Sequence, residues 1–225
     1  MTKFVGKMTN LPPDAQVWRY LSLATFIDIL QNGHMFFPRL QNFEDPYEGS
    51  MPMAVRNYLN RSLFPQDDLI EELESEIKTA CVGCWHINNG ESAAMWKLYA
   101  HKSGVAIQSS LRRLGTGFRY EDLTMGCVDY IDFDNARDLS NLHPAFLKRK
   151  SFSYEQELRL VVYEPDQERY KAGKYVPIVF EKLVEQVYVS PVEPPWLAEV
   201  VRKELEQYAV ATEVIHSQLY SKTLT

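Results

Sequence analysis

The sequence lacks a long apolar run, a cysteine framework and an excess of basic charge. No stretch approaches the roughly 20 apolar residues of a membrane helix, and Met1–Asn10 lacks the apolar block of a signal peptide. We therefore expect a cytoplasmic protein without a membrane partner. The chain carries 24 Lys and Arg against 30 Asp and Glu, a net charge of −6. No global basic field is thus available to hold the phosphates of nucleic acid.

Cysteine is scarce as well. The three cysteines form an odd set, and in a chain without an export signal we expect reduced thiols rather than a disulfide framework. Cys81 and Cys84 make a C-x-x-C pair, but a zinc site needs a second ligand pair, for which the sequence offers only His86 and Cys127. A redox pair would open a helix, whereas this segment has the residues of a strand. We expect buried strand cysteines and no metal.

Glycine-rich nucleotide motifs are also absent. Neither G-x-G-x-x-G nor G-x-x-x-x-G-K-[ST] occurs, which excludes a Rossmann or P-loop nucleotide site in its usual form. The sequence has no internal repeat, low-complexity segment or linker. It has 225 residues, of which 45% are hydrophobic, and these suffice for the packed core of one domain over residues 1–225.

Helical and strand patterns interleave without a regular βαβ period. Ser22 and Gly33 are typical of the start and the end of a helix. We predict strands at 17–21, 81–87, 105–108, 126–131, 157–163, 175–180, 186–189 and 212–215, and helices at 23–32, 65–78, 92–102, 144–150 and 195–208. The expected fold class is α+β, with a mixed, largely antiparallel sheet flanked by helices.

The segment before and within the strand at 157–163 carries the most chemistry. Side chains alternate along a strand, so Glu155, Glu157 and Arg159 are expected to share one face. That face is either a solvated surface with an internal ion pair or a cleft. In a cleft, Arg159 would keep a carboxylate ionised for electrostatic or general-base work.

A basic triplet, Lys148, Arg149 and Lys150, ends the helix predicted at 144–150. Lysine and arginine bind nucleic acid chiefly through its phosphates. Because the net charge is acidic, this triplet is the local patch through which a nucleic-acid partner would have to bind.

Arg19 and the aromatic residues near position 90 are further candidates. Arg19 lies in an apolar strand, so it must face water, pair with a glutamate or bind an anion such as phosphate. Trp85, His86 and Tyr99 surround one predicted strand–loop–helix turn. They either pack in the core or wall a pocket for a flat ring.

Four ordered motifs resemble an uncharacterised bacterial family that is catalogued only as a domain of unknown function. The motifs are W-R-Y-L at 18–21, F-x-D-P-Y-E-G at 43–49, C-W-H at 84–86 followed by E-S-x-x-M-W-x-x-Y at 91–99, and K-R-x-x-F-x-x-E-x-E-x-R at 148–159. The resemblance covers nearly the whole chain. It implies no activity.

The order of elements is also similar to that of ADP-ribosyltransferases, which split NAD at the nicotinamide–ribose bond. This similarity implies an ADP-ribosyltransferase-like fold and NAD as substrate. Arg19 would hold the pyrophosphate, Trp85 or Tyr99 would lie against nicotinamide, and a glutamate would stabilise the oxocarbenium-like ribose. The implied cofactor-binding residues are Arg19, Tyr20, Trp85, His86, Tyr99 and Arg159, and the implied catalytic residues are Glu157 and Glu155.

Three functions stay open at this point. The first is an NAD-consuming transferase or glycohydrolase, with a role as a toxin or antiphage effector. The second is a non-catalytic ligand sensor or interaction module that uses the same aromatic pocket. The third is a metal-dependent nuclease in which Asp45, Glu48, Glu155 and Glu157 hold Mg²⁺.

We expect the motifs to converge on one cleft, because charged side chains away from water need partners. A mutually neutralising set is available in Arg19, Asp45, Glu48, Glu155, Glu157 and Arg159. Glu157 is the principal catalytic candidate, since it opens a regular strand and shares its face with Arg159. The loop at 43–49 is expected to be structural first, with Asp45 bonding its own loop amides.

Overall fold

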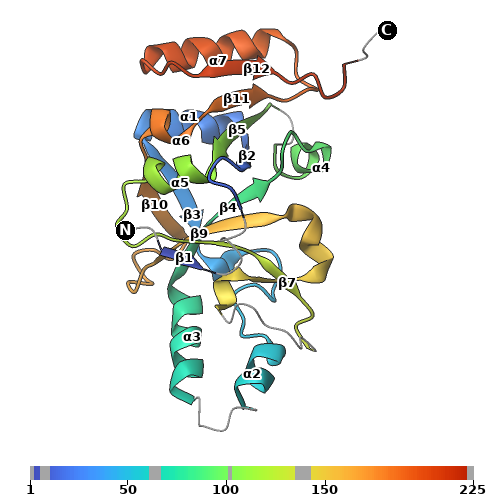
Figure 1. The fold of residues 1–225 in the computed structure, drawn as a ribbon. Coiled ribbons are helices and arrows are strands. Elements are labelled where there is room, and N and C mark those ends of the chain that lie inside the picture. The colour runs from blue at the N-terminus through green and yellow to red at the C-terminus, as the bar shows by residue number, and fades with distance from the viewer. Residues whose placement is uncertain (1–2, 6–10, 61–66, 101–102, 135–142, 222–225) are drawn as a thin grey trace. The chain divides into compact units, whose positions relative to one another are not determined.

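The structure, a computed structural model, describes residues 3–5, 11–60, 67–100, 103–134 and 143–221. The chain divides into two compact units, each built from three separate stretches of sequence (Figure 1). The first unit comprises Met1–Leu11, Phe36–Cys84 and Glu121–Tyr175, and the second comprises Pro12–Met35, Trp85–Tyr120 and Val176–Thr225. The expectation of one domain over residues 1–225 stays a prediction.

Four strands lie side by side in the first unit. Their order is β1 (Lys3–Val5), β6 (Thr124–Cys127), β9 (Glu157–Tyr163) and β4 (Ala80–Ile87), of which β4 continues along the chain into the second unit. β1 and β6 are parallel, and β6 and β9 are antiparallel, with Gly126 opposite Arg159. Every residue from Glu157 to Val162 is buried. The strand predicted at 157–163 is therefore confirmed, and both of its faces are covered.

A smaller sheet in this unit pairs β7 (Asp129–Ile131) with β8 (Leu147–Arg149) in parallel. It corrects two predictions. The strand predicted at 126–131 is divided at Val128, whose amide bonds the carbonyl of Glu157 at 2.9 Å. The helix predicted at 144–150 is wrong, because only a 3₁₀ turn, η4 (Pro144–Phe146), precedes β8. Strand pairing and burial of Leu147 and Lys148 override the local helical preference.

Two helices cover the small sheet. Val55 and Leu59 of α2 (Met53–Asn60) pack in one cluster with Leu73 of α3 (Asp67–Thr79) and with Ile131 and Leu147. The helix predicted at 65–78 is confirmed over its described residues, and its acidic side faces away from this cluster, as the 3.6-residue period requires. Short 3₁₀ turns η2 (Leu40–Asn42) and η5 (Lys150–Glu155) complete the unit.

The second unit contains the end of β4 and four further strands. They follow in the order β2 (Gln16–Ser22), β5 (Gly104–Ser110), β11 (Gln186–Val189) and β12 (Glu213–His216). The pairs from β4 to β11 are antiparallel, and β11 and β12 are parallel. The chain between β11 and β12 forms α7 (Trp196–Gln207), which contacts both strands. Parallel neighbours need such a crossover.

The predicted start and end of the first helix are confirmed. α1 (Leu23–Asn32) begins at Ser22, whose side chain accepts a bond from the Thr25 amide, and it ends at Gly33 in the left-handed region with φ 62°. The other helices of this unit are α4 (Ala93–Met95), the π-helical turn η3 (Trp96–Ala100), α5 (Leu111–Gly117) and α6 (Phe180–Leu183). The predicted helix at 92–102 is thus partly π-helical, and residues 101–102 lie outside the described residues. β3 (His34–Pro38) pairs with β10 (Gly173–Pro177) in a two-stranded sheet.

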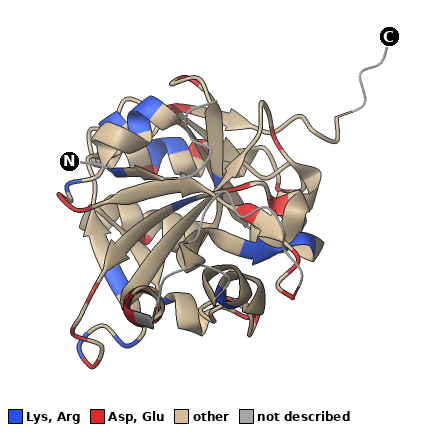
Figure 2. Ribbon diagram, turned by 60° about the horizontal axis from the view of Figure 1, so that its bottom comes forward, with Lys and Arg blue, Asp and Glu red and all other residues tan. Residues whose placement is uncertain are grey.

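The fold class is α+β, with largely antiparallel strands flanked by helices, as predicted. Acidic and basic residues are interspersed along the ribbon rather than separated by sign (Figure 2). Within the described part of the chain, every helix is too short or too polar to cross a membrane.

Candidate functional site

A sharp turn between η5 and β9 places the two candidate glutamates. Gln156 separates Glu155 from Glu157 and adopts the left-handed region, with φ 42°. Glu155 therefore ends the 3₁₀ turn instead of belonging to β9, which differs from the strand alternation we expected. The turn brings both carboxylates onto one ammonium group, with Lys148 Nζ 2.5 Å from Glu155 Oε2 and 2.6 Å from Glu157 Oε1.

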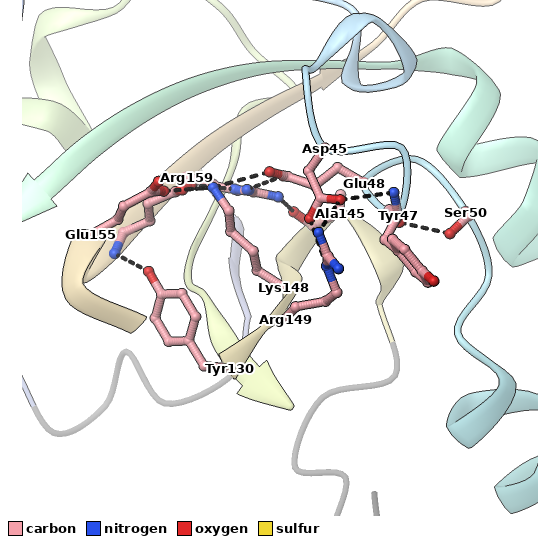
Figure 3. Close-up of polar contacts among 11 residues, drawn as sticks. Asp45, Tyr47, Glu48, Ser50, Tyr130, Ala145, Lys148, Arg149, Glu155 and Arg159 are labelled. Atoms are coloured by element: carbon pink, nitrogen blue, oxygen red, sulfur yellow. Dashed lines mark hydrogen bonds and ion pairs between the residues drawn. The ribbon is translucent and has the colours of Figure 1, made fainter. Parts of the chain in front are cut away.

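Arg159 and Glu48 complete the cluster (Figure 3). Arg159 donates from Nε to Glu157 Oε2 at 2.6 Å and also pairs with Glu48 through Nη2. Its Nη1 donates to the carbonyl of Ala145 at 2.9 Å. Glu48 Oε1 lies 3.0 Å from Lys148 Nζ, so each cation holds at least two carboxylates.

All members of this carboxylate cluster, which we define as Glu48, Lys148, Glu155, Glu157 and Arg159, are buried. Their exposed fractions range from 0% for Arg159 to 7% for Glu48. The interpretation of this face as a solvated surface is therefore wrong. The cluster holds three carboxyl groups against two cations, so one negative charge has no matching cation inside it. Buried charge without a partner is costly, and a proton bound by one carboxyl group removes that cost.

The proton belongs mainly to Glu155. Burial and the neighbouring Glu157, which hydrogen bonds to it, raise the pKa of Glu155 from 4.5 to about 7. Burial alone would also raise the pKa of Glu157, but Arg159, the hydrogen bond from Glu155 and Lys148 hold it well below its ordinary value. Between about pH 5 and 7, Glu155 is therefore mainly protonated, whereas Glu157 is ionised.

The loop at 43–49 supports this cluster. Asp45 Oδ1 accepts a bond from the Tyr47 amide at 3.1 Å, and both its oxygens bind Arg149, at 2.7 and 3.0 Å. Gly49 allows the loop to turn with φ 74°. The Asp45 geometry agrees with the expected structural role, whereas Glu48 of the same loop is part of the carboxylate cluster.

The basic triplet does not form a surface patch. Lys148 is buried in the carboxylate cluster, and Arg149 is bound to Asp45 while its guanidinium lies 4.3 Å from the centre of the Tyr47 ring. Lys150 alone is exposed. The predicted local nucleic-acid patch is therefore corrected: strand β8 points neighbouring side chains to opposite sides, and ion pairs occupy two of the three cations.

Four of the five candidates of the second unit lie on β2 and β4 and divide between two faces of the sheet, and the fifth, Tyr99, lies on η3. Trp18 is opposite His86 in the β2–β4 register, so Arg19 and Trp85 lie on the other face. Tyr20 and His86 share a face, with ring centroids 6.5 Å apart. The sequence analysis placed Arg19 and Tyr20 at one ligand. They are adjacent in β2, so their side chains point to opposite faces of the sheet.

The aromatic candidates also differ in exposure. Trp85 is 1% exposed, which agrees with core packing, whereas Tyr99 on η3 is 49% exposed. The Tyr20 hydroxyl accepts a bond from the Ser92 amide at 2.8 Å, and its ring meets Trp96 edge-on at 5.0 Å. Among these candidate rings, that of Tyr99 has the largest exposed fraction.

The candidates thus fall in different units. Glu155, Glu157 and Arg159 belong to the first unit, and Arg19 with the aromatic candidates belongs to the second. The convergence of all motifs on one cleft stays a prediction. Sequence reasoning missed Lys148 as the shared cation and Tyr130, whose hydroxyl accepts the Glu157 amide at 2.8 Å. The one signal for Lys148 was its spacing of seven and nine residues from the two glutamates.

The cysteines agree in part with the expectation of buried strand thiols, because Cys81 is buried whereas Cys84 and Cys127 are half-buried. Cys81, Cys84 and Cys127 are free thiols, and Cys81 and Cys84 lie in β4. Cys84 lies near the carboxylate cluster, and burial, together with Glu157, raises its pKa, so the thiol stays protonated. Among the described residues, no three His, Cys, Asp or Glu side chains are grouped so that they could hold a metal ion.

Comparison with known proteins gives similarity at low identity. No family model matches the chain, and no curated protein matches it. Solved structures of DarT from Thermus sp. 2.9 are similar. The complex with ADP-ribosylated ssDNA has 12% identity and a TM-score of 0.44, covering 92% of this chain and 96% of DarT. The complex with NAD+ has 13% identity and a TM-score of 0.43, covering 93% and 98%. At this level the similarity assigns no residue a role.

Proposed function

We propose that the chain is an NAD-consuming enzyme that breaks the nicotinamide–ribose bond, as an NAD glycohydrolase or an ADP-ribosyltransferase. The observation that carries the proposal is the buried pair of Glu155 and Glu157, which share Lys148 but differ in their affinity for a proton. Paired carboxyl groups with separated pKa values recur in enzymes that cleave bonds to sugar carbons.

The chemistry of NAD matches such a pair. The nicotinamide ring of NAD is cationic and leaves as a neutral molecule with the electron pair of the broken C–N bond. Positive charge then develops on ribose, and a preorganised negative charge stabilises it. Water or an acceptor hydroxyl forms the new C–O bond and gives its proton to a base, whose pKa should lie near the working pH.

Glu155 fits the base better than Glu157 does. Both oxygens of Glu157 are held by cations, whereas Glu155 ends the turn beside the exposed residues Tyr154 and Gln156. We therefore assign Glu155 the contact with the reacting groups. Glu157 supplies fixed charge and orients Lys148.

The predicted cofactor-binding residues also divide into residues that position the site and residues that contact the ligand. Arg159 donates all of its observed bonds to the protein and has no exposed surface, so we propose it as a positioning residue for Glu157 rather than a ligand contact. Arg19, Tyr20, Trp85, His86 and Tyr99 stay predicted NAD contacts. Tyr99→Ala is the direct test of this prediction. Because Tyr99 is exposed, the substitution should raise the KM for NAD without unfolding the chain.

The experiment that tests the function is incubation of the pure protein with NAD and measurement of free nicotinamide. Glu155→Gln should lower the rate on the order of a hundredfold or more, because it removes the base. Glu157→Gln should fold, since the cluster then holds two carboxyl groups and two cations, but should also lose activity through the lower pKa of Glu155. The matched control is Glu199→Gln, at an exposed ion pair on α7, which should keep the full rate.

Several outcomes would overturn the proposal. If Glu155→Gln folds and releases nicotinamide at an undiminished rate, Glu155 is not the base. Wild-type protein that binds NAD but releases no nicotinamide favours the ligand-sensing alternative. In cells, an NAD-consuming toxin or antiphage effector should lower the NAD pool and arrest growth, and Glu155→Gln should relieve both effects.

The nuclease alternative has less support from the same geometry. Its four acids are Asp45, Glu48, Glu155 and Glu157, and each is paired with Arg149, Lys148 or Arg159. The cations lie where Mg²⁺ would have to bind.

A further inference from the structure

The first residue of β9 is held through its backbone as well as through its carboxyl group. The Glu157 carbonyl accepts a bond from the Val128 amide at 2.9 Å. The Glu157 amide donates to the Tyr130 hydroxyl at 2.8 Å (Figure 3). In a regular antiparallel pair, one residue of the neighbouring strand exchanges both bonds. Here the neighbouring strand is divided at Val128, and a tyrosine side chain supplies the acceptor in place of a strand carbonyl.

The Glu157 amide depends on this acceptor. Glu157 is 6% exposed, and a backbone N–H away from water is costly without a partner. Gln156, the residue before it, adopts the left-handed region with φ 42°, which a residue with a side chain disfavours. Tyr130 therefore acts at a junction where the local backbone preference does not hold the chain in place.

Tyr130 and Lys148 reach this junction from one small sheet. They are opposite each other in the parallel β7–β8 register, so their side chains leave the sheet on the same face. Lys148 Nζ binds the carboxyl groups of Glu155 and Glu157 at 2.5 and 2.6 Å, and the Tyr130 hydroxyl binds the main chain between those two residues. Two neighbouring side chains thus fix both the carboxyl groups and the backbone of the turn at 155–157.

We infer that Tyr130 is a positioning residue for the proposed reaction, because its hydroxyl fixes the Glu157 amide and, through the turn, the placement of the Glu155 base relative to the charge of Glu157. The inference rests on the proposed function for its catalytic meaning, whereas the contact exists without it. Tyr130 takes up no proton and does not bind NAD. A displaced base transfers a proton more slowly, so loss of the hydroxyl should lower kcat and leave the KM for NAD unchanged.

The first test needs no activity. Hydrogen exchange of the Glu157 amide is followed by NMR in ¹⁵N-labelled protein. In the wild type this amide should exchange slowly, although it is the first of its strand and follows a left-handed residue. Tyr130→Phe keeps the ring and removes the acceptor, so the amide should exchange at least about fivefold faster. Fast exchange in the wild type, or an unchanged rate in Tyr130→Phe, contradicts the inference.

Tyr163→Phe is the matched control. Tyr163 ends β9 and is half-buried, and its hydroxyl is hydrogen bonded to His143 Nε2 at 2.7 Å. This variant therefore also loses one hydroxyl bond on the same strand, but away from the turn. It should leave both the exchange of the Glu157 amide and kcat unchanged. If the two variants accelerate the exchange or lower kcat equally, the effect is a general loss of stability and the inference is wrong.

Nicotinamide release from NAD separates this inference from the proposed function. In Tyr130→Phe, kcat should fall about ten- to a hundredfold while the KM for NAD stays within about twofold of the wild-type value. A wild-type kcat in Tyr130→Phe would make the contact purely structural and overturn the inference. Wild-type protein without nicotinamide release contradicts the proposed function, and the exchange measurement still decides whether Tyr130 holds the turn.

Discussion

Two buried arginines of the first unit bind different kinds of partner, although both guanidinium groups need hydrogen-bond acceptors away from water. Arg39, 3% exposed, donates to five backbone carbonyls, at distances from 2.7 to 3.4 Å, in the residues Lys78, Thr79, Tyr170, Glu164 and Asp166. Arg159 is bound to two carboxylates and one carbonyl. Arg39 joins the end of α3 to a distant loop through neutral groups, whereas Arg159 fixes the charge of reactive groups.

The kind of partner decides whether the contacts of a buried arginine depend on pH. Backbone carbonyl groups are neutral and do not titrate, so the Arg39 contacts depend on geometry alone. Carboxyl partners titrate, so the Arg159 contacts depend on the number of protons in the cluster. Loss of Arg39 and loss of Arg159 should therefore respond differently to pH.

The largest expected effect is the loss of Arg159. Arg159→Met leaves two buried carboxylates with only Lys148 and should cost about 3 to 5 kcal/mol in the free energy of unfolding at neutral pH. The cost should fall as the pH is lowered, because the carboxyl groups then take up protons. Arg39→Met should also destabilise, but by an amount that changes little with pH. Urea unfolding at pH 5 and 8 measures both, and equal pH responses would contradict the comparison.

The next effect concerns Glu155, and its sign follows from the raised pKa. A carboxyl group whose pKa rises from 4.5 in the unfolded chain to about 7 in the folded chain stabilises the fold fully below 4.5. That stability is lost as pH rises through about 7. This contribution should therefore fall by up to about 3 kcal/mol between pH 5 and 8, read as the difference in free energy of unfolding between wild type and Glu155→Gln at each pH. Glu155→Gln stays neutral and should flatten this fall.

Thermal unfolding of both proteins at one-unit pH steps checks this prediction. Glu157 has the opposite shift, so its contribution is present above 4.5 and lost as pH falls below that value. It adds no slope between pH 6 and 8. Burial lowers the pKa of His143 to about 4, so the His143 contribution rises with pH only up to about 6.5, and the fall assigned to Glu155 is read between pH 6.5 and 8. A wild-type slope that persists in Glu155→Gln would assign it to another group.

The smallest effect concerns the left-handed turn at Gln156. A residue with a side chain pays about 1 to 2 kcal/mol for this conformation, and glycine avoids most of that cost. Gln156→Gly should raise the free energy of unfolding by about 0.5 to 1 kcal/mol and lower nicotinamide release, because the two glutamates are held less firmly.

Ala209 is the control for this turn. It has φ 55° after α7, is exposed, and lies far along the chain from the glutamates. Ala209→Gly should give a similar gain in stability with an unchanged rate. A rate loss in Ala209→Gly, or an unchanged rate in Gln156→Gly, would separate the turn from the chemistry.

Local pattern predicted the elements that local energies control. Helix α1 was found from its Ser22 cap and Gly33 stop, and β9 from its apolar alternation, since both signals lie within a few residues. The prediction at 144–150 failed because the strand there depends on pairing with β7, which lies 18 residues earlier in the register. Pairing energies of that kind are invisible in a single segment.

The sequence by itself determined that Glu157 and Arg159 share one side of a strand and that charge accumulates at 148–159. Only the tertiary structure decided that Glu48 joins them, across 111 residues from Arg159, and that the charges number three against two. Side-chain alternation is a local property of the backbone, whereas the protonation of a buried carboxyl group depends on every charge packed around it. For that reason four of the five cluster residues could be named from the sequence, but neither the shared cation Lys148 nor which glutamate carries the proton.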